Sequence, residues 1–232
     1  MKIIFTILSV SLATICLLLS SKFLPNIPIL LNKNEFINGL LKYQMFAFCI
    51  AILFLLTTLQ VSPQSKSLLK FGNIGSLAIK EKWLGINGET TWRLNAIQLA
   101  LFISLATGIF MFLAVKYTDS LGNFTWNFLP LIILISLTNS FSEETLYRIA
   151  INGNLTSNTS KLTVLLISAV LFGIPHYFGF PTGVIGVIMS AALGYILSKA
   201  TYETQGIGIA WTIHFLQDVI IFTALFMMKV KG

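Results

Sequence analysis

Six ionisable side chains fall inside long apolar stretches of the chain and could carry out chemistry there. A charged side chain at the middle of a membrane-spanning helix costs about 2.5 to 3.5 kcal/mol on insertion scales. Carboxylates, imidazoles and a guanidinium are the groups that transfer protons and stabilise developing charge. The six side chains therefore form one candidate site. They are Glu143, Glu144, Arg148, His176, His214 and Asp218.

The spacing of these residues separates supporting groups from free ones. Glu144 and Arg148 are four residues apart, the distance at which a carboxylate and a guanidinium meet on one helix face. Glu143 is rotated from Glu144 by about 100° and is expected to point into the bundle. His214 and Asp218 are also four apart, so Asp218 is expected to accept a hydrogen bond from His214 and fix the nitrogen that faces the site.

Three short motifs carry a resemblance to a known family. The segment 143–148 reads EETLYR, segment 172–176 reads FGIPH and segment 214–218 reads HFLQD. They resemble the E-E-x-x-x-R, F-x-x-x-H and H-x-x-x-N/D motifs of the CPBP family, the CAAX proteases and bacteriocin-processing enzymes also called Abi proteins. The motifs occur in the family's order and cover about 128–218. Asp218 departs from the Asn of the prenyl-protein proteases.

The resemblance implies an intramembrane endopeptidase that hydrolyses peptide bonds at or in the membrane. In this interpretation Glu143 is the general base for a water molecule, His176 helps to hold that water, and His214 donates to the oxyanion. Asp218 orients His214, and Arg148 neutralises Glu144. The expected substrate is a membrane-embedded or lipidated peptide or protein, of the CAAX type or of the bacteriocin and peptide-processing type.

Two readings of the cofactor remain open at this stage. Glu143, or Glu144 in its place, could join His176 and His214 in the two-histidine, one-carboxylate set of a catalytic zinc site. The chain has no H-E-x-x-H helix, and the resemblance to the prenyl-protein proteases also supports a glutamate-dependent reaction without bound metal. The favoured reading needs no cofactor, and zinc is the alternative.

The composition shows which elements must position the site. Apolar residues make up 56% of the 232 residues and charged residues only 10%, which excludes a soluble domain. The basic residues are scattered singly, so the net charge of +7 does not indicate nucleic acid as a partner. The pattern predicts an all-α, polytopic helical membrane bundle. Seven spans are expected, at 3–19, 40–61, 96–115, 128–151, 162–178, 182–197 and 207–228.

The spans divide into an N-terminal part, 1–127, and a core of four spans, 128–232, that holds the motifs. The basic loop at about 62–95 is expected in the cytoplasm by the positive-inside rule, which places the N-terminus there as well. Lys161 and Lys199 are expected in loops on that side. The composition suggests a bacterial cytoplasmic membrane.

The sequence also predicts how the fifth and sixth spans pack against each other. The fifth and sixth spans should pack as a hairpin, and Gly186, Ser190 and Gly194 should let two helices approach closely.

Two rival functions are a membrane scaffold that has lost catalysis and a proton-coupled transporter. A transporter predicts polar groups strung across the bilayer, whereas here they gather in one zone.

Overall fold

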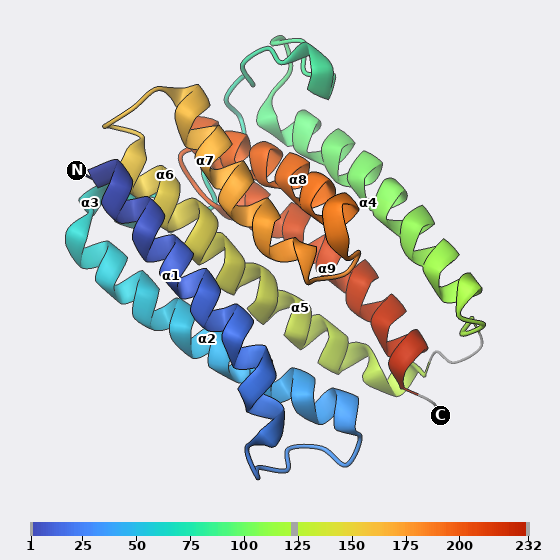
Figure 1. Cartoon of the computed structure of the whole chain (residues 1–232). Helices are drawn as coiled ribbons and strands as arrows, with labels where there is room; N and C mark the ends of the chain where they lie inside the picture. The colour runs from blue at the N-terminus through green and yellow to red at the C-terminus, as the bar shows by residue number, and fades with distance from the viewer. Residues whose placement is uncertain (1, 122–124, 231–232) are drawn as a thin grey trace.

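The protein is a bundle of long helices that lie side by side (Figure 1). The computed structural model describes residues 2–121 and 125–230. The long helices are α1 (Lys2–Phe23), α2 (Glu35–Val61), α4 (Trp92–Tyr117), α5 (Leu129–Glu144), α7 (Lys161–Gly173), α8 (Gly183–Thr204) and α9 (Gly208–Lys229). Shorter helical segments are η1 (Leu24–Asn26), α3 (Pro63–Ser67), η2 (Lys82–Leu84), η3 (Trp126–Phe128), η4 (Thr145–Ile149), α6 (Ala150–Leu155) and η5 (Ile174–Tyr177).

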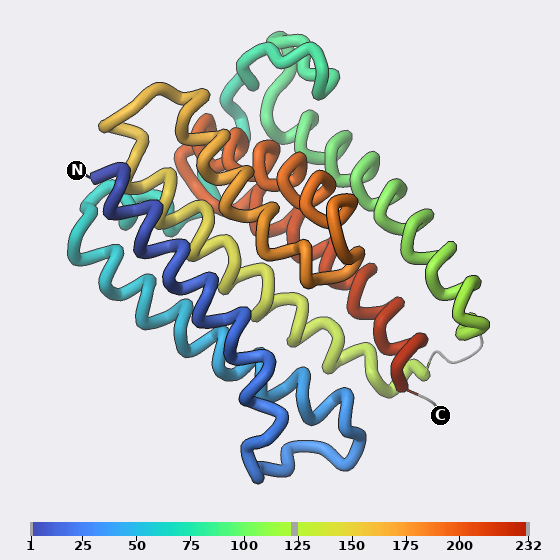
Figure 2. The backbone as a smooth tube through the Cα atoms, in the orientation of Figure 1, coloured from blue at the N-terminus to red at the C-terminus, as the bar shows by residue number. Residues whose placement is uncertain are grey.

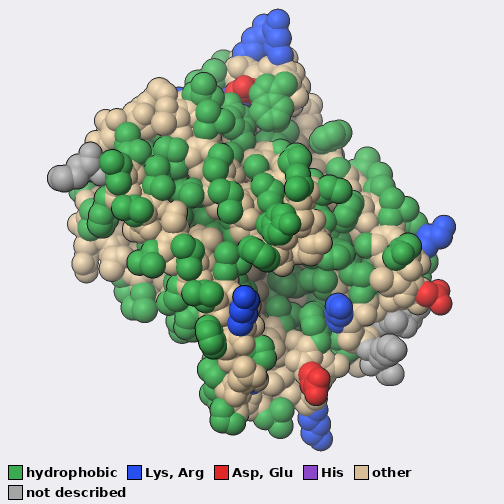
Figure 3. Space-filling model, in the orientation of Figure 1, with side chains coloured by type: hydrophobic (Ala, Val, Ile, Leu, Met, Phe, Trp, Pro, Cys, Tyr) green, Lys and Arg blue, Asp and Glu red, His purple; other side chains and the backbone are tan. Residues whose placement is uncertain are grey.

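The helices confirm the predicted polytopic membrane bundle. Within the described residues, five helices are long and apolar enough to cross a membrane: α1 together with η1, α2, α4, α8 and α9. The fourth expected span is the helical stretch that runs from α5 through η4 to α6, and the fifth is the shorter apolar stretch Lys161–Tyr177. Hydrophobic side chains cover most of the visible face of the molecule (Figure 3). The chain is an integral membrane protein.

The expected hairpin of the fifth and sixth spans is confirmed, because α7 and α8 pack along each other. Small residues bring the two helices close. A methyl group on Gly194 would lie 3.0 Å from the ring of Phe172, and one on Gly186 would lie 2.7 Å from the carbonyl oxygen of His176. The small residues of α8 therefore set the distance at which α8 supports the motif on α7 and η5.

Helices from the first half of the chain pack directly on those that carry the motifs. α2 lies along α5, and α4 lies along α9 (Figure 2). α1 packs against α6 and α7. An apolar cluster joins α1, α2, η4, α6 and α7, and its buried members include Val10, Ala47, Leu146, Ile151, Leu165 and Phe172.

The expectation that Lys199 lies in a loop is wrong. α8 continues to Thr204, and Lys199 is fully buried in its last turns. The ammonium group of Lys199 donates to the carbonyl oxygen of Ile79 at 2.8 Å and to the carboxylate of Glu203. These partners remove the cost of burying the charge, so the helix can continue past the lysine.

The same carboxylate attaches the long loop between α3 and α4 to the bundle. One oxygen of Glu203 accepts from Lys161 and Lys199, and the other accepts from the backbone N–H of Ile79 at 2.8 Å and from Nε1 of Trp92 at 3.0 Å. The side chain of Glu203 is only 3% exposed. A buried, fully paired carboxylate therefore holds this loop on α8.

The start of α1, the long loop and the connection between α6 and α7 lie at one end of the bundle (Figure 1). Two contacts hold α3 and its N-cap residue at this end. Ser62 donates to the carbonyl oxygen of Gly153 at 2.9 Å, and Ser157 donates to the side chain of Gln64 at 3.0 Å. The shared end agrees with the topology expected from the basic residues, while its assignment to the cytoplasm stays a prediction.

Candidate active site

The pair of glutamates lies where the helix of the fourth span changes its winding. α5 ends at Glu144, and the π-helical turn η4 follows directly. Single π turns inside α-helices occur frequently at functional sites because they displace the ladder of backbone hydrogen bonds. Here the hydroxyl of Ser168 donates to the carbonyl oxygen of Tyr147 at 2.8 Å. A side chain of α7 thus supplies a hydrogen bond to a backbone carbonyl group within the π-helical turn.

The predicted pairing of Glu144 with Arg148 is confirmed. Oε2 of Glu144 lies 3.1 Å from Nε of Arg148, and both side chains are fully buried. The guanidinium also lies over the ring of Phe172, 4.2 Å from its centroid, which is a favourable cation–π position. The ion pair and the ring together compensate a charge that has no access to solvent.

The second oxygen of Glu144 orients His214. Oε1 lies 2.8 Å from Nδ1 of the imidazole. A carboxylate accepts, so Nδ1 carries the hydrogen and Nε2 is directed to the site. The expected role of Asp218 as the orienter of His214 is wrong in this geometry, because Oδ1 of Asp218 lies 3.7 Å from Nε2, beyond hydrogen-bond distance. The buried carboxylate of Glu144 takes the other nitrogen instead.

Glu143 is the less constrained member of the pair. Its side chain is 24% exposed, and Oε2 lies 3.5 Å from Nε2 of His214. Oε1 accepts a hydrogen bond from Asn139 at 3.2 Å. Among the described residues no donor bonds Oε2. The predicted division is confirmed, since Glu144 is paired on both oxygens and Glu143 faces open space.

His176 is positioned by a tightened helix end. α7 passes into the 3-10 segment η5, whose second residue is Pro175. Nδ1 of His176 donates to the carbonyl oxygen of Phe172 at 2.7 Å, so the neutral ring presents the lone pair of Nε2. The ring of Phe172 lies between the histidines, with centroids 4.8 Å from His176 and 5.4 Å from His214. One aromatic side chain therefore spaces both imidazoles.

Asn139 is a residue of the site that the sequence interpretation missed. Its amide nitrogen donates to Oε1 of Glu143 at 3.2 Å and to Oδ2 of Asp218 at 3.0 Å. Its oxygen accepts from Gln44 of α2 at 3.0 Å. Asn139 precedes Glu143 by one helical turn, but an uncharged amide does not stand out in an apolar span. The structure shows that its amide nitrogen bridges the carboxylates of Glu143 and Asp218.

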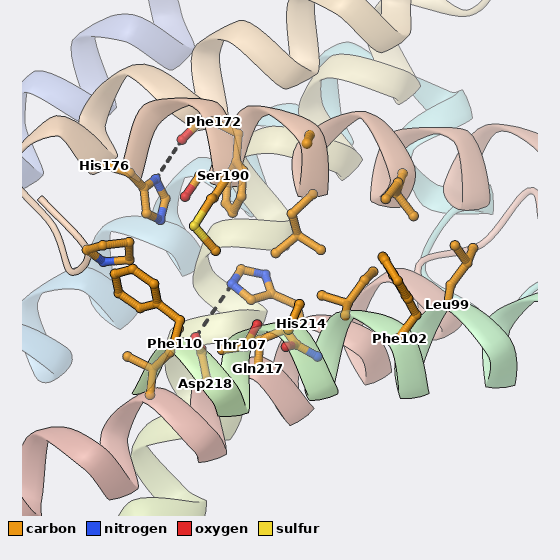
Figure 4. Close-up of a pocket in the computed structure, with 18 of the residues that line it drawn as sticks. Leu99, Phe102, Thr107, Phe110, Phe172, His176, Ser190, His214, Gln217 and Asp218 are labelled. Carbon is orange, nitrogen blue, oxygen red and sulfur yellow. Dashed lines mark hydrogen bonds and ion pairs between the residues drawn. The ribbon is translucent and has the colours of Figure 1, made fainter. Parts of the chain in front are cut away.

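The site opens into a large, mainly apolar cavity of about 850 Å³. Figure 4 shows His176 and Phe172 on one wall and His214, Gln217 and Asp218 on the opposite wall. The cavity extends between α4 and α8 along apolar side chains. They include Leu99, Phe102, Phe110, Leu193 and Ile196. Trp83 and Leu84 of the long loop line its end. An extended apolar ligand of moderate size fits such a space.

The arrangement does not fit the alternative zinc site. Within residues 2–121 and 125–230, no three His, Cys, Asp or Glu side chains gather closely enough to hold a metal ion. Within the part of the chain that the structure describes, Glu143, His176 and His214 are therefore not assembled as a set of metal ligands.

The site lies within a segment that matches a family model. Residues 125–220 match the model described as type II CAAX prenyl endopeptidase Rce1-like. The searches of curated proteins and of solved structures found no match. The matched segment contains all six site residues of the three motifs and confirms the resemblance drawn from them. This segment of the chain is therefore similar to the Rce1-like type II CAAX prenyl endopeptidases.

Proposed function

We propose that the protein is an intramembrane endopeptidase in which Glu143 activates water to hydrolyse a peptide bond. The observation that carries the proposal is the unequal environment of the two glutamates. Glu144 is buried between Arg148 and His214, whereas Glu143 faces the cavity beside Nε2 of His214. A fixed carboxylate next to a free one is the arrangement that a general base and its support require.

The reaction follows from the side-chain atoms of the site that can reach water or substrate. Glu143 takes a proton from water while the water oxygen forms a bond to the carbonyl carbon. Nε2 of His176 accepts a hydrogen bond from the same water. Nε2 of His214, protonated among the carboxylates, donates to the oxyanion of the tetrahedral intermediate. The carbon–nitrogen bond then breaks, and Glu143 returns its proton to the leaving amine, so that acid and amine are released.

The apolar cavity favours a substrate that carries a lipid. We propose a prenylated CAAX-type peptide as the substrate, with a peptide precursor of the bacteriocin type as the second candidate. The family description names prenyl endopeptidases, and the apolar walls of the cavity suit an isoprenoid chain. We place the N-terminus and the basic loop in the cytoplasm of a bacterial cell.

The proposal is tested with purified protein in lipid nanodiscs and a farnesylated peptide that carries a fluorescence-quenched scissile bond. We expect cleavage by the wild type and a loss of at least about 100-fold in kcat for Glu143→Gln. Glu89→Gln, an exposed loop variant, serves as the control. Equal cleavage by Glu143→Gln and the wild type would contradict the proposal, as would the absence of cleavage of both a prenylated and an unprenylated peptide.

The absence of a cofactor is part of the proposal. We expect cleavage to persist after treatment with a chelator and dialysis, with zinc measured on the same samples. Stoichiometric zinc that is lost together with activity would contradict a metal-independent reaction.

A further inference from the structure

A second, smaller cavity of about 290 Å³ lies on the other side of the candidate base. It is lined by residues of α1, α2, α5, η4, η5 and the turn after η5. Its lining is mainly apolar but includes five hydroxyl groups, which belong to Thr14, Ser21, Tyr43, Ser142 and Tyr147. The hydroxyls of Thr14 and Tyr147 lie 2.7 Å apart. In contrast to the large cavity, this space offers many hydrogen-bonding groups in a small volume.

The two cavities share one wall, and that wall holds the reactive groups. Asn139, Glu143, His176 and Gly179 line both cavities. His214 lines only the large cavity, and Tyr147 lines only the small one. The candidate base therefore faces both spaces, while the candidate oxyanion donor faces only the space that suits the substrate.

The chemistry of the small cavity matches water. A water molecule occupies about 30 Å³ in the liquid and needs two to four polar partners, so the cavity has room for several. Within the described chain, Oε2 of Glu143 has no hydrogen-bond partner in the protein. Because Glu143 lines this cavity and keeps one carboxylate oxygen without a hydrogen bond to the protein, it is placed to take its nucleophile from that space.

We propose that the small cavity is a water chamber that supplies the nucleophile to Glu143 from the side opposite the substrate. This inference rests on the proposed protease function. A water from the chamber gives its proton to Glu143, and its oxygen adds to the carbonyl carbon presented from the large cavity. The substrate can then fill the apolar space without displacing the water that attacks it, which keeps both reactants at the shared wall.

Cysteine labelling tests the chamber without any substrate. In a background in which the exposed Cys16 and Cys49 are replaced by Ala, Ser142→Cys places a thiol in the chamber. Ser136→Cys is the matched control. Both serines lie on α5, are almost fully buried, and donate to a backbone carbonyl of their own helix at 2.7 Å, but Ser136 lines neither cavity.

A small charged methanethiosulfonate is the probe. Because thiols react as thiolates, which form in hydrated surroundings, we expect Ser142→Cys to react about tenfold or more faster than Ser136→Cys. Equal labelling rates for the two variants would overturn the proposal of a water chamber, whatever the activity of the protein.

Filling the chamber tests its supply of water. Ala47 on α2 lines the chamber, whereas Ala51 one turn later is equally buried and lines neither cavity. Leucine at either position overpacks the same helix, which costs about 1 to 3 kcal/mol. We expect Ala47→Leu to lower kcat about tenfold with little change in KM and to slow labelling of Ser142→Cys, because fewer waters reach the base. Ala51→Leu should do neither.

The outcomes separate the two proposals. Equal kcat values for Ala47→Leu and Ala51→Leu, with labelling slowed only in the first, would overturn the supply of water through the chamber. Rapid labelling of Ser142→Cys in a protein that shows no Glu143-dependent cleavage would overturn the protease function, and the delivery of a nucleophile with it. Cleavage that depends on Glu143 while Ser142→Cys stays unlabelled would overturn the chamber alone.

Discussion

Nδ1 of His214 lies 2.8 Å from Oε1 of Glu144, a carboxylate whose other oxygen lies 3.1 Å from Nε of Arg148. One buried side chain on α5 therefore binds both a cation of its own helical stretch and the imidazole of α9. The two halves of the E-E motif have different tasks as a result. Glu144 fixes the direction of His214, and Glu143 stays free beside Nε2.

This relationship predicts that Glu144 matters more than Asp218 for the orientation of His214. We expect Glu144→Gln to lower kcat about 100-fold with little effect on KM, because the imidazole loses its charged acceptor. Asp218→Asn keeps an oxygen that accepts from Asn139 and should retain kcat within about tenfold of the wild type. Steady-state kinetics of both variants, with thermal unfolding as the check on folding, decide between them. A larger loss in Asp218→Asn would show that Asp218 orients the ring.

The helical period explains which parts of the site could be predicted from the sequence. Spans follow from apolar length, and the pair of Glu144 with Arg148 follows from a separation of four residues on one helix. The same separation predicts a bond between His214 and Asp218. The imidazole can, however, bond to a carboxylate of its own helix α9 or to one of α5. Glu144 precedes His214 by 70 residues, and no local pattern reveals which carboxylate it meets. The ion pair within one helix could therefore be predicted, whereas the partner of His214 on another helix could not.

Arg148 should matter chiefly for stability. Arg148→Met leaves Glu144 buried without its cation, which we expect to lower the free energy of unfolding by about 3 to 5 kcal/mol. The double variant Arg148→Met, Glu144→Gln removes both charges and should recover much of that loss while cleavage stays impaired. Thermal unfolding in one detergent measures the series, with the exposed Lys116→Met as the control. A double variant less stable than Arg148→Met would contradict the argument.

Gly186 should position His176 through close backbone contact. A methyl group there would lie 2.0 Å from the carbonyl oxygen of Pro181 and 2.7 Å from that of His176, so the turn after η5 must move. We expect Gly186→Ala to lower kcat/KM more than about tenfold, since small displacements of positioned groups are costly. Gly108→Ala is the control, because no atom lies within 4 Å of its added methyl group. The prediction fails if the two variants cleave equally well.

Glu203 should hold the long loop over the end of the large cavity. Glu203→Gln leaves Lys161 and the buried Lys199 without their shared carboxylate, although Glu81 still lies 3.4 Å from Lys199. Lys199→Met leaves the contacts of Glu203 with Lys161, Trp92 and the backbone of Ile79 in place. Removing one partner of a buried ion pair costs about 3 to 5 kcal/mol, and the cost falls on the charge that remains buried.

We therefore expect Glu203→Gln to release the loop and Lys199→Met to disturb it less. Trypsin reports the difference, because release of the loop from α8 makes the backbone around Lys80 and Lys82 more accessible to the protease. Cleavage there should be faster in Glu203→Gln than in Lys199→Met and slowest in the exposed loop variant Glu89→Gln. The released loop should also raise KM for a lipidated peptide, because Trp83 and Leu84 no longer close the cavity. If trypsin cuts all three variants at the same rate, the carboxylate does not anchor the loop.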